Sequence, residues 1–419
     1  MRIEIVTIGS EVLSGRTLDT NFVFLARALE EASVLVAWHS TVGDSVEAIG
    51  EALKQALARA DAVVLVGGLG PTPDDVTRKA VATALNRPLQ LEESVLAHIR
   101  ERVKKGGRKM PASVETMALV PRGAEVWQNP VGAAPGVLIP YRKKAVILLP
   151  GPPAELEAVA TRHAVPWLRE RSGLAVESFT LRTYGLFESQ LHERIGKLPD
   201  QWPGATLAYL PSWFGVDLRV TVVGGSASVA RESAERAYRD LLERVRGVVY
   251  AEGTQTMEQA VADALLERGW RIAVAESCTG GLLAKRLTDL PGASRYVDRG
   301  FVTYSNESKL QLLGVSRDVL TTHGAVSAPV AEQMAAGARK KAGVEVGVGV
   351  TGVAGPDGGS EKKPVGTVYI AVHSPIGDAV RVHKFMGTRS TVRERAAQTA
   401  LDMLRRHLAE LPVDPVAEA

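Results

Sequence analysis

Short β-branched runs alternate with amphipathic segments along residues 1 to about 165 of this chain. Such alternation is typical of sheet strands that are covered by helices. The apolar runs 3–8, 34–40, 62–66 and 145–149 predict the strands of a parallel sheet, and the segments 21–32 and 45–60 predict helices. The pattern therefore predicts an α/β domain at the start of the chain.

The middle of the chain has a different order of elements. Residues 176–249 predict strand, helix, strand, strand and helix at 178–184, 188–196, 206–209, 216–223 and 228–245, which is a small α+β unit. Residues 251–256 are expected to be a linker. The α/β alternation then resumes with a helix at 257–268 and strands at 271–275, 344–350, 367–372 and 380–385. We therefore expect three domains, at 1–170, 171–252 and 253–419.

Composition narrows the class of protein. Fifty basic and 47 acidic residues leave a net charge of +3, so nucleic-acid binding is not expected from charge alone. Cys278 is the single cysteine, which excludes an internal disulfide and any cysteine-based metal cluster. No apolar run approaches the roughly 20 residues that cross a bilayer, and a strand-like run follows Met1 directly. We expect a cytoplasmic protein without a membrane-spanning segment.

The first candidate site lies where the predicted strand 271–275 ends. Ser277, Cys278 and Thr279 come before Gly280 and Gly281, and a helix is predicted at 282–290. Glycines allow close backbone approach, and the free N–H groups of a helix start attract a phosphate or an oxyanion. Ser277 is the candidate nucleophile, with the alternative that Ser277 and Thr279 merely cap the helix.

Two further strand exits are expected to open onto the same crevice, because active sites of open α/β sheets gather at the carboxyl ends of strands. One exit presents Tyr304, Asn306 and Lys309, and a buried lysine can act as a base. The alternative is a solvated helix lysine. The other exit is a glycine-rich loop, 351–359, and Arg389 and Arg393 lie at the start of the last helix, where they can pair a phosphate.

These segments resemble the C-terminal domain of the CinA family, the nicotinamide mononucleotide deamidases, over residues 254–410. The resemblance rests on the motifs at 275–281, 304–309, 323–327, 351–359 and 363–367. It implies a metal-free hydrolysis in which Ser277 attacks the carboxamide and Lys309, directly or through Tyr304, takes its proton. The residues expected to contact this substrate are Thr279, Gly280, Gly281, Asn306, Ser327, Thr351, Gly352, Ala354, Gly355, Arg389 and Arg393.

A second candidate site follows the predicted strand 62–66. Residues 67–77 form a glycine loop that contains Asp74 and Asp75 and leads into a helix. Such a loop can seat a phosphate, and the carboxylates offer hard oxygen ligands to Mg²⁺. The alternative is that both aspartates serve the positive end of the following helix.

This half resembles the molybdopterin-binding fold of the MoaB and MogA proteins, and more closely the N-terminal domain of CinA proteins, over residues 2 to about 165. Leu69 stands where molybdenum-cofactor enzymes usually carry threonine, which favours the CinA branch. That branch implies an ADP-ribose pyrophosphatase that uses Mg²⁺ or a similar divalent metal, with a monovalent cation as a further candidate. The implied metal ligands are Asp44, Asp75 and Glu155, and the implied substrate-binding residues are Ser10, Glu11, Asn21, Gly67, Gly68, Gly70, Asp74, Thr77 and Asn129.

Two rival functions remain open. The α+β unit has the order of a KH-like module but lacks a clear glycine-pair clamp, so a competence-related, DNA-associated or regulatory role rests on that unit alone. Trp202 and Trp213 are expected to pack rather than to stack on bases. A molybdopterin-handling enzyme is the second rival. The main hypothesis is salvage of pyridine nucleotides by a homodimer, and the dimer is implied by the resemblance only.

Overall fold

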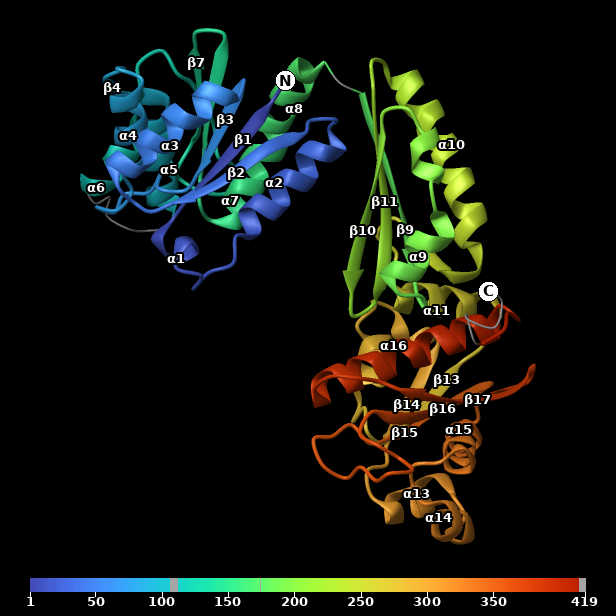
Figure 1. Cartoon of the computed structure of the whole chain (residues 1–419). Helices are drawn as coiled ribbons and strands as arrows, with labels where there is room; N and C mark the ends of the chain where they lie inside the picture. The colour runs from blue at the N-terminus through green and yellow to red at the C-terminus, as the bar shows by residue number, and fades with distance from the viewer. Residues whose placement is uncertain (106–111, 174, 414–419) are drawn as a thin grey trace. The chain divides into compact units, whose positions relative to one another are not determined.

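The computed structural model describes residues 1–105, 112–173 and 175–413 (Figure 1). The chain divides into two compact units. The first comprises Met1–Glu177 with Val222–Arg231, and the second comprises Ser178–Thr221 with Glu232–Ala419. In the described residues, no helix is both long and apolar enough to cross a membrane.

The N-terminal sheet has six strands in the order β2-β1-β3-β8-β7-β6. The four strands β2 (Val36–Val42), β1 (Ile3–Ile8), β3 (Ala62–Val66) and β8 (Lys144–Leu149) are parallel, as predicted. The sheet is not wholly parallel, however, because β7 (Gly136–Tyr141) and β6 (Glu125–Trp127) run antiparallel. A tight turn that starts at Arg142, whose φ is 55°, joins β7 to β8 as a hairpin.

Helices cover both faces of this sheet. Val63 and Leu65 of β3 pack with residues of α3 (Val46–Arg59), α4 (Thr77–Ala84) and α5 (Glu93–Lys105). Val64 and Val66 face the other way, toward α2 (Thr20–Glu31) and α7 (Pro153–Val159). This alternation explains why the apolar run 62–66 is buried along its whole length. The remaining elements are α1 (Ser10–Leu13), β4 (Leu89–Leu91), α6 (Ala112–Glu115), β5 (Leu119–Pro121) and α8 (Val165–Ser172).

The middle segment forms a four-stranded sheet in the order β10-β11-β9-β12 with two helices. Its elements are β9 (Ala175–Thr183), α9 (Glu188–Ile195), β10 (Ala205–Ser212), β11 (Gly215–Gly224), α10 (Ala227–Val245) and β12 (Val249–Glu252). The predicted α+β order is confirmed. The predicted linker at 251–256 is wrong at its start, because Ala251 and Glu252 pair with Arg182 and Leu181 of β9.

The C-terminal sheet has the order β14-β13-β15-β16-β17. Strands β14 (Val297–Val302), β13 (Ile272–Glu276) and β15 (Val346–Gly352) are parallel, whereas β16 (Thr367–Ser374) and β17 (Gly377–Lys384) are antiparallel. One face is covered by α11 (Met257–Glu267), α12 (Leu282–Thr288) and α16 (Arg389–Leu408). The other is covered by α13 (Asn306–Leu313), α14 (Arg317–His323) and α15 (Ala328–Ala342) (Figure 1).

Glycines in β15 allow α15 to lie directly on this sheet. A Cβ added to Gly347 would lie 2.0 Å from the carbonyl oxygen of Ala335, and one added to Gly349 would lie 2.3 Å from that of Ala331. No side chain fits at such distances. The close packing fixes the carboxyl end of β15 beside that of β13.

Candidate active site

The carboxyl ends of three parallel strands meet at Ser277. The Ser277 N–H donates to the carbonyl of Val350 in β15 over 2.9 Å. The Thr303 N–H, after β14, donates to the carbonyl of Glu276 over 2.8 Å. These two bonds hold the backbone on either side of Ser277 in register with both neighbouring strands, so the three predicted strand exits lie side by side.

A buried amine contacts the Ser277 hydroxyl. Lys309 Nζ donates to Ser277 Oγ over 3.2 Å and also to the carbonyl oxygens of Thr303, over 2.7 Å, and Tyr304, over 3.4 Å. Ser305 caps α13 by accepting from the Ser308 N–H, which places Lys309 one helical turn inside, where its side chain is 1% exposed. The alternative of a solvated helix lysine is therefore wrong.

Burial changes the protonation of this amine. Desolvation lowers the pKa of Lys309 from 10.5 to about 8, and only a weaker interaction with Cys278 opposes the shift. Among the described residues no carboxylate forms an ion pair with Lys309, and its three acceptors are uncharged. An amine in these surroundings is available as a base near neutral pH.

The neighbouring thiol is not a competitor for the nucleophile. Cys278 is buried among apolar side chains of the core. Desolvation raises the pKa of the Cys278 thiol to about 11, so the thiol stays protonated. Of the hydroxyl and thiol groups at this junction that the structure describes, Ser277 is the one that hydrogen-bonds to the Lys309 amine.

The start of α12 differs from the sequence-based expectation. The N–H groups of Gly281, Leu283 and Ala284 all donate to the carboxylate of Glu276, over 3.0, 3.0 and 2.8 Å. The expected free anion cradle is therefore already satisfied by a buried side chain of the protein itself. The strand ends on this acid, whose carboxylate neutralises the helix start. The prediction of free N–H groups at Gly280 and Gly281 is wrong for both, because the Gly280 N–H donates to the carbonyl of Ser277 over 3.1 Å and the Gly281 N–H donates to Glu276.

Other donors remain beside Ser277. The main-chain N–H groups of Cys278 and Thr279 both interact with the sulfur of Cys278, which is a weak acceptor. The hydroxyls of Thr279 and Thr303 are buried and have no hydrogen-bond partner in the described part of the chain. Unsatisfied buried polar groups are costly, so donors of this kind are suited to an oxyanion that forms only during reaction.

Two arginines of α16 connect the loops around the site. Arg389 donates to the Tyr304 hydroxyl over 2.8 Å and to the carbonyl of Gly355 over 2.8 Å. Arg393 donates twice to the carbonyl of Thr279, over 2.8 and 3.3 Å. Within the described residues, the Tyr304 hydroxyl forms no hydrogen bond with Ser277 or Lys309. The structure therefore offers the direct proton path from Ser277 to Lys309 and no path through the Tyr304 hydroxyl.

The remaining predicted contacts divide into packed and exposed groups. Thr351 Oγ1 donates to the carbonyl of Ala325 over 2.8 Å, and Ser327 Oγ donates to that of Gly324 over 2.9 Å. Ala354 is buried, and a Cβ on Gly352 would lie 2.6 Å from a Val368 methyl. These residues shape the loops. Asn306, Tyr304 and Arg389 are exposed and accessible to a ligand.

The N-terminal glycine loop is closed by Thr77 at the start of α4. Gly67 and Gly68 have φ of 104° and 65°, a region that favours glycine. Thr77 Oγ1 donates to the carbonyl of Gly67 over 2.8 Å, and the Thr77 N–H donates to that of Gly68 over 3.2 Å. Thr77 is fully buried, and its two hydrogen bonds fix the loop to the start of α4.

Neither aspartate of this loop lies in the first turn of α4. Asp75 instead accepts from the N–H and hydroxyl of Thr72, over 2.9 and 2.5 Å, and a Cβ on Gly70 would lie 2.4 Å from its carboxylate. The hydrogen bond from Thr72 lowers the pKa of the Asp74 carboxyl. The alternative, in which both aspartates interact with the positive end of α4 from its first turn, is therefore wrong.

The predicted metal ligands are each engaged separately. Asp44 accepts from the Ser10 N–H over 2.8 Å, and Glu155 accepts from Asn129 Nδ2 over 2.6 Å. Throughout residues 1–105, 112–173 and 175–413, no three His, Cys, Asp or Glu side chains are grouped so that they could hold a metal ion. Asp44, Asp75 and Glu155 therefore do not form a metal centre made by the protein alone. Asn21 donates to the carbonyl of Gly151 over 2.7 Å, and Glu11 is exposed.

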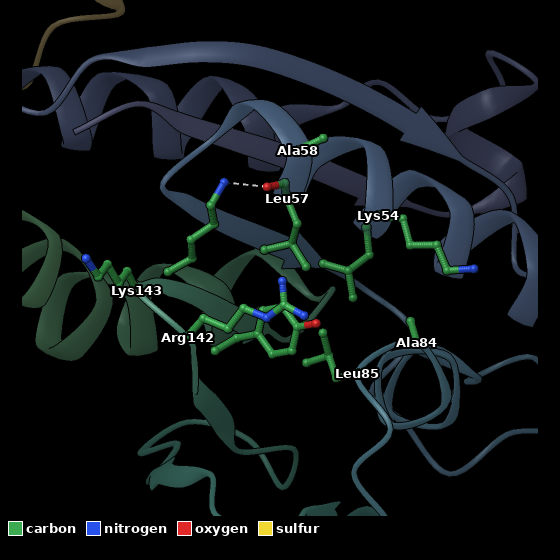
Figure 2. Close-up of a pocket in the computed structure, with 10 residues that line it drawn as sticks. Lys54, Leu57, Ala58, Ala84, Leu85, Arg142 and Lys143 are labelled. Atoms are coloured by element: carbon green, nitrogen blue, oxygen red, sulfur yellow. Dashed lines mark hydrogen bonds between the residues drawn. The ribbon is translucent and has the colours of Figure 1, made fainter.

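A basic hollow that sequence analysis missed lies at the other end of the N-terminal sheet, where β8 begins (Figure 2). It has a volume of about 590 Å³ and is lined by Lys54, Arg142, Lys143 and Lys144 with apolar residues of α3 and α4. Lys144 Nζ donates to the carbonyl of Ala60 over 2.9 Å, so this cation stabilises the end of α3. The contact between Lys144 and Ala60 is therefore explained by helix stabilisation and does not require a ligand.

Three family models match the chain in succession. They are described as a probable molybdopterin binding domain over residues 4–170, a damage-inducible protein CinA KH domain over residues 178–251 and a CinA C-terminal domain over residues 254–408. The fold and the matches define a protein with a MoaB-like α/β domain, a KH-like domain and a CinA-type α/β domain. The predicted fold class is confirmed.

Relatives match over nearly the whole chain. A CinA-like protein of Gemmatimonas aurantiaca is 42% identical over 415 residues, which are 98% of this chain and 97% of the relative. A putative competence-damage inducible protein of Symbiobacterium thermophilum is also 42% identical, over 97% of this chain and 98% of the relative. The chain belongs to the CinA family. Among solved structures, the competence/damage inducible protein CihA of Agrobacterium tumefaciens is 43% identical and covers 36% of this chain and 95% of its own, with a TM-score of 0.34.

Proposed function

We propose that the C-terminal domain hydrolyses the carboxamide of nicotinamide mononucleotide to give nicotinate mononucleotide and ammonia. The observation that carries the proposal is the contact of 3.2 Å between Lys309 Nζ and Ser277 Oγ, with the amine buried and its pKa lowered to about 8 by desolvation. A hydroxyl beside a neutral amine is an activated nucleophile for acyl transfer. The same pair lies next to the main-chain N–H groups of Cys278 and Thr279, whose acceptor, the Cys278 thiol, is weak enough for an oxyanion to displace.

The reaction divides into two steps. Neutral Lys309 takes the Ser277 proton while the hydroxyl oxygen attacks the carboxamide carbon, and the resulting oxyanion is held by the N–H groups of Cys278 and Thr279. The carbon–nitrogen bond then breaks, and Lys309 returns the proton to the leaving nitrogen as ammonia departs. Water attacks the acyl-serine ester with Lys309 again as base, which restores the Ser277 hydroxyl and releases the carboxylate.

The exposed residues around the pair are consistent with this substrate. Its ring is a pyridinium cation, and an exposed aromatic ring such as Tyr304, which is 60% exposed, can stack against a cation. Its phosphate requires a cation, and Arg389 lies beside the Tyr304 hydroxyl. We therefore expect Tyr304 to contact the ring and Arg389 to contact the phosphate.

For the N-terminal domain we propose hydrolysis of ADP-ribose to AMP and ribose 5-phosphate. The proposal is supported by the glycine loop itself. The buried Thr77 side chain donates a hydrogen bond to the carbonyl of Gly67, and Asp75 accepts one from the Thr72 N–H, so both ends of the loop are held by hydrogen bonds. Mg²⁺ usually takes one or two carboxylates and completes its shell with phosphate oxygens and water. We therefore propose a divalent cation that enters with the pyrophosphate and is not resident in the protein.

One experiment tests both activities. The full chain is incubated with nicotinamide mononucleotide and with ADP-ribose, each with Mg²⁺ or with EDTA, and products are identified by mass. We expect nicotinate mononucleotide in both conditions, and AMP only with Mg²⁺. Absence of nicotinate mononucleotide would remove the first proposal, and absence of AMP would remove the second.

The rival functions have their own readouts. A role on DNA requires a salt-sensitive shift with single-stranded DNA, because phosphate contacts release counterions. A molybdopterin-handling role requires that a pterin, and not ADP-ribose, raise the unfolding temperature of the protein. Neither outcome is expected.

A further inference from the structure

A large groove lies within the second compact unit, apart from the Ser277 site. Its volume is about 1050 Å³. The first turn of α9 and the tip of the β10–β11 hairpin form one side, and the end of β17 and the middle of α16 form the other. Ligand pockets are commonly hollows of roughly 300–1,000 Å³, so the groove is large enough for a small organic molecule.

Hydrogen bonds fasten the two sides of the groove to each other. The hydroxyls of Tyr184 and Thr399 are 2.7 Å apart. Gln398 Nε2 donates to the carbonyl of Phe214 over 3.0 Å. Gln398 is fully buried, and Tyr184 and Thr399 themselves line the groove. The groove therefore has a fixed shape and a ligand would enter a largely preformed site.

Aromatic rings line the groove and are open to a ligand. Phe187 is 71% exposed and Trp213 is 56% exposed, although large apolar side chains are normally covered. Tyr209 and Phe385 also line it. The Arg395 guanidinium lies over the Trp213 ring, 5.4 Å from its centre, in a cation–π contact. Such rings are platforms for a planar heterocycle.

The charge of the groove is positive. Arg381, Lys384 and Arg395 line it, and in the described residues none of them forms an ion pair. The acids that line it are Glu188 and Asp402, and Asp402 is bridged by Arg405, over 2.8 Å, and by Arg406, over 2.9 Å. Within the described residues, three cations of the groove without an ion pair therefore stand against one such acid, Glu188. An anion is the ligand that this charge favours.

We propose that this groove binds a nucleoside phosphate, with the base against Trp213 and Phe187 and the phosphate against Arg381 and Lys384. Trp213 and Phe187 lie on one side of the groove and Arg381 and Lys384 on the other, which matches a ligand that has a ring at one end and an anion at the other. The site is distinct from the amidase site, whose α16 contacts are made by Arg389 and Arg393 and not by Arg395.

The test measures binding of AMP to the full chain by calorimetry in EDTA. We compare the wild type with Trp213→Ala and with the double variant Arg381→Ala/Lys384→Ala. The matched control is Arg142→Ala/Lys143→Ala, which removes the same charge from the basic hollow of the N-terminal domain. We expect the groove variants to weaken AMP binding at least about tenfold, the control to keep the wild-type Kd, and adenosine and inorganic phosphate to bind more weakly than AMP.

Three results would overturn the proposal. The first is a wild-type protein that binds no AMP, and the second is an AMP affinity that is equal in all variants. The third is tighter binding of a thymidine oligonucleotide than of AMP that is lost in the groove variants, which would assign the groove to single-stranded nucleic acid. Thermal unfolding of each variant shows whether it is folded. Trp213, Arg381 and Lys384 are exposed, so we expect unchanged unfolding temperatures.

Discussion

The pH dependence of ammonia release should report the titration of Lys309. Desolvation lowers the pKa of this amine from 10.5 to about 8. The difference corresponds to about 3 kcal/mol in favour of the neutral form, and at pH 7 about a tenth of the molecules then carry a neutral amine. A lysine with its ordinary pKa would be neutral in fewer than about one molecule in a thousand at that pH.

The sign follows from the role of the amine as a base. Below its pKa Lys309 is protonated and cannot take the Ser277 proton, so kcat/KM for nicotinamide mononucleotide should rise roughly tenfold from pH 6 to pH 7 and level off above about pH 8. The assay follows ammonia release at low substrate concentration from pH 6 to pH 10. Tyr304→Phe serves as the control and should keep the same profile, because its hydroxyl contacts Arg389 and not Lys309. A flat profile between pH 6 and pH 8, or a midpoint near 10.5, would refute the reasoning.

Further predictions concern individual contacts. Lys309→Met should lower kcat by about 10²–10⁴-fold while the protein stays folded, which steady-state kinetics and circular dichroism measure together; a loss below tenfold would argue against Lys309 as the base. Glu276→Gln should lower the free energy of unfolding by about 1–3 kcal/mol, because three N–H groups lose a charged acceptor, and urea unfolding measures it; equal stability would contradict the assigned role. Arg389→Met should raise KM more than it lowers kcat, and the reverse pattern would place Arg389 in the chemical step. EDTA should leave ammonia release unchanged.

Much of the fold follows from local apolar patterning. The runs 3–8 and 62–66 are buried on both sides of a parallel sheet, and their bounds match β1 and β3. The proximity of Ser277 and Lys309 could also be predicted, since both follow neighbouring strands whose carboxyl ends meet at one edge. The antiparallel direction of β7 could not, because strand direction depends on a two-residue turn and not on apolar pattern.

Other features depend on contacts between distant segments. Sequence marks the glycines after Ser277 as an anion site, yet the partner of the helix N–H groups is Glu276, which lies one residue beyond the predicted strand 271–275 and is the last residue of β13. The direction in which that side chain turns is a property of the folded loop. The groove at Trp213 is lined by residues of the middle segment and by others near 381–403. No local sequence motif therefore predicts it. Burial of Lys309, and hence its lowered pKa, likewise depends on contacts with Ser277 and Thr303, which follow two different strands.

Trapping of the acylated enzyme tests the central claim most directly. The full chain is mixed with nicotinamide mononucleotide, quenched in acid during turnover and digested, and peptides are identified by mass. The account predicts a nicotinate mononucleotide ester on the peptide that contains Ser277, and neither the ester nor ammonia release with Ser277→Ala. Ammonia release at the wild-type rate by Ser277→Ala, or an adduct on another residue, would contradict it.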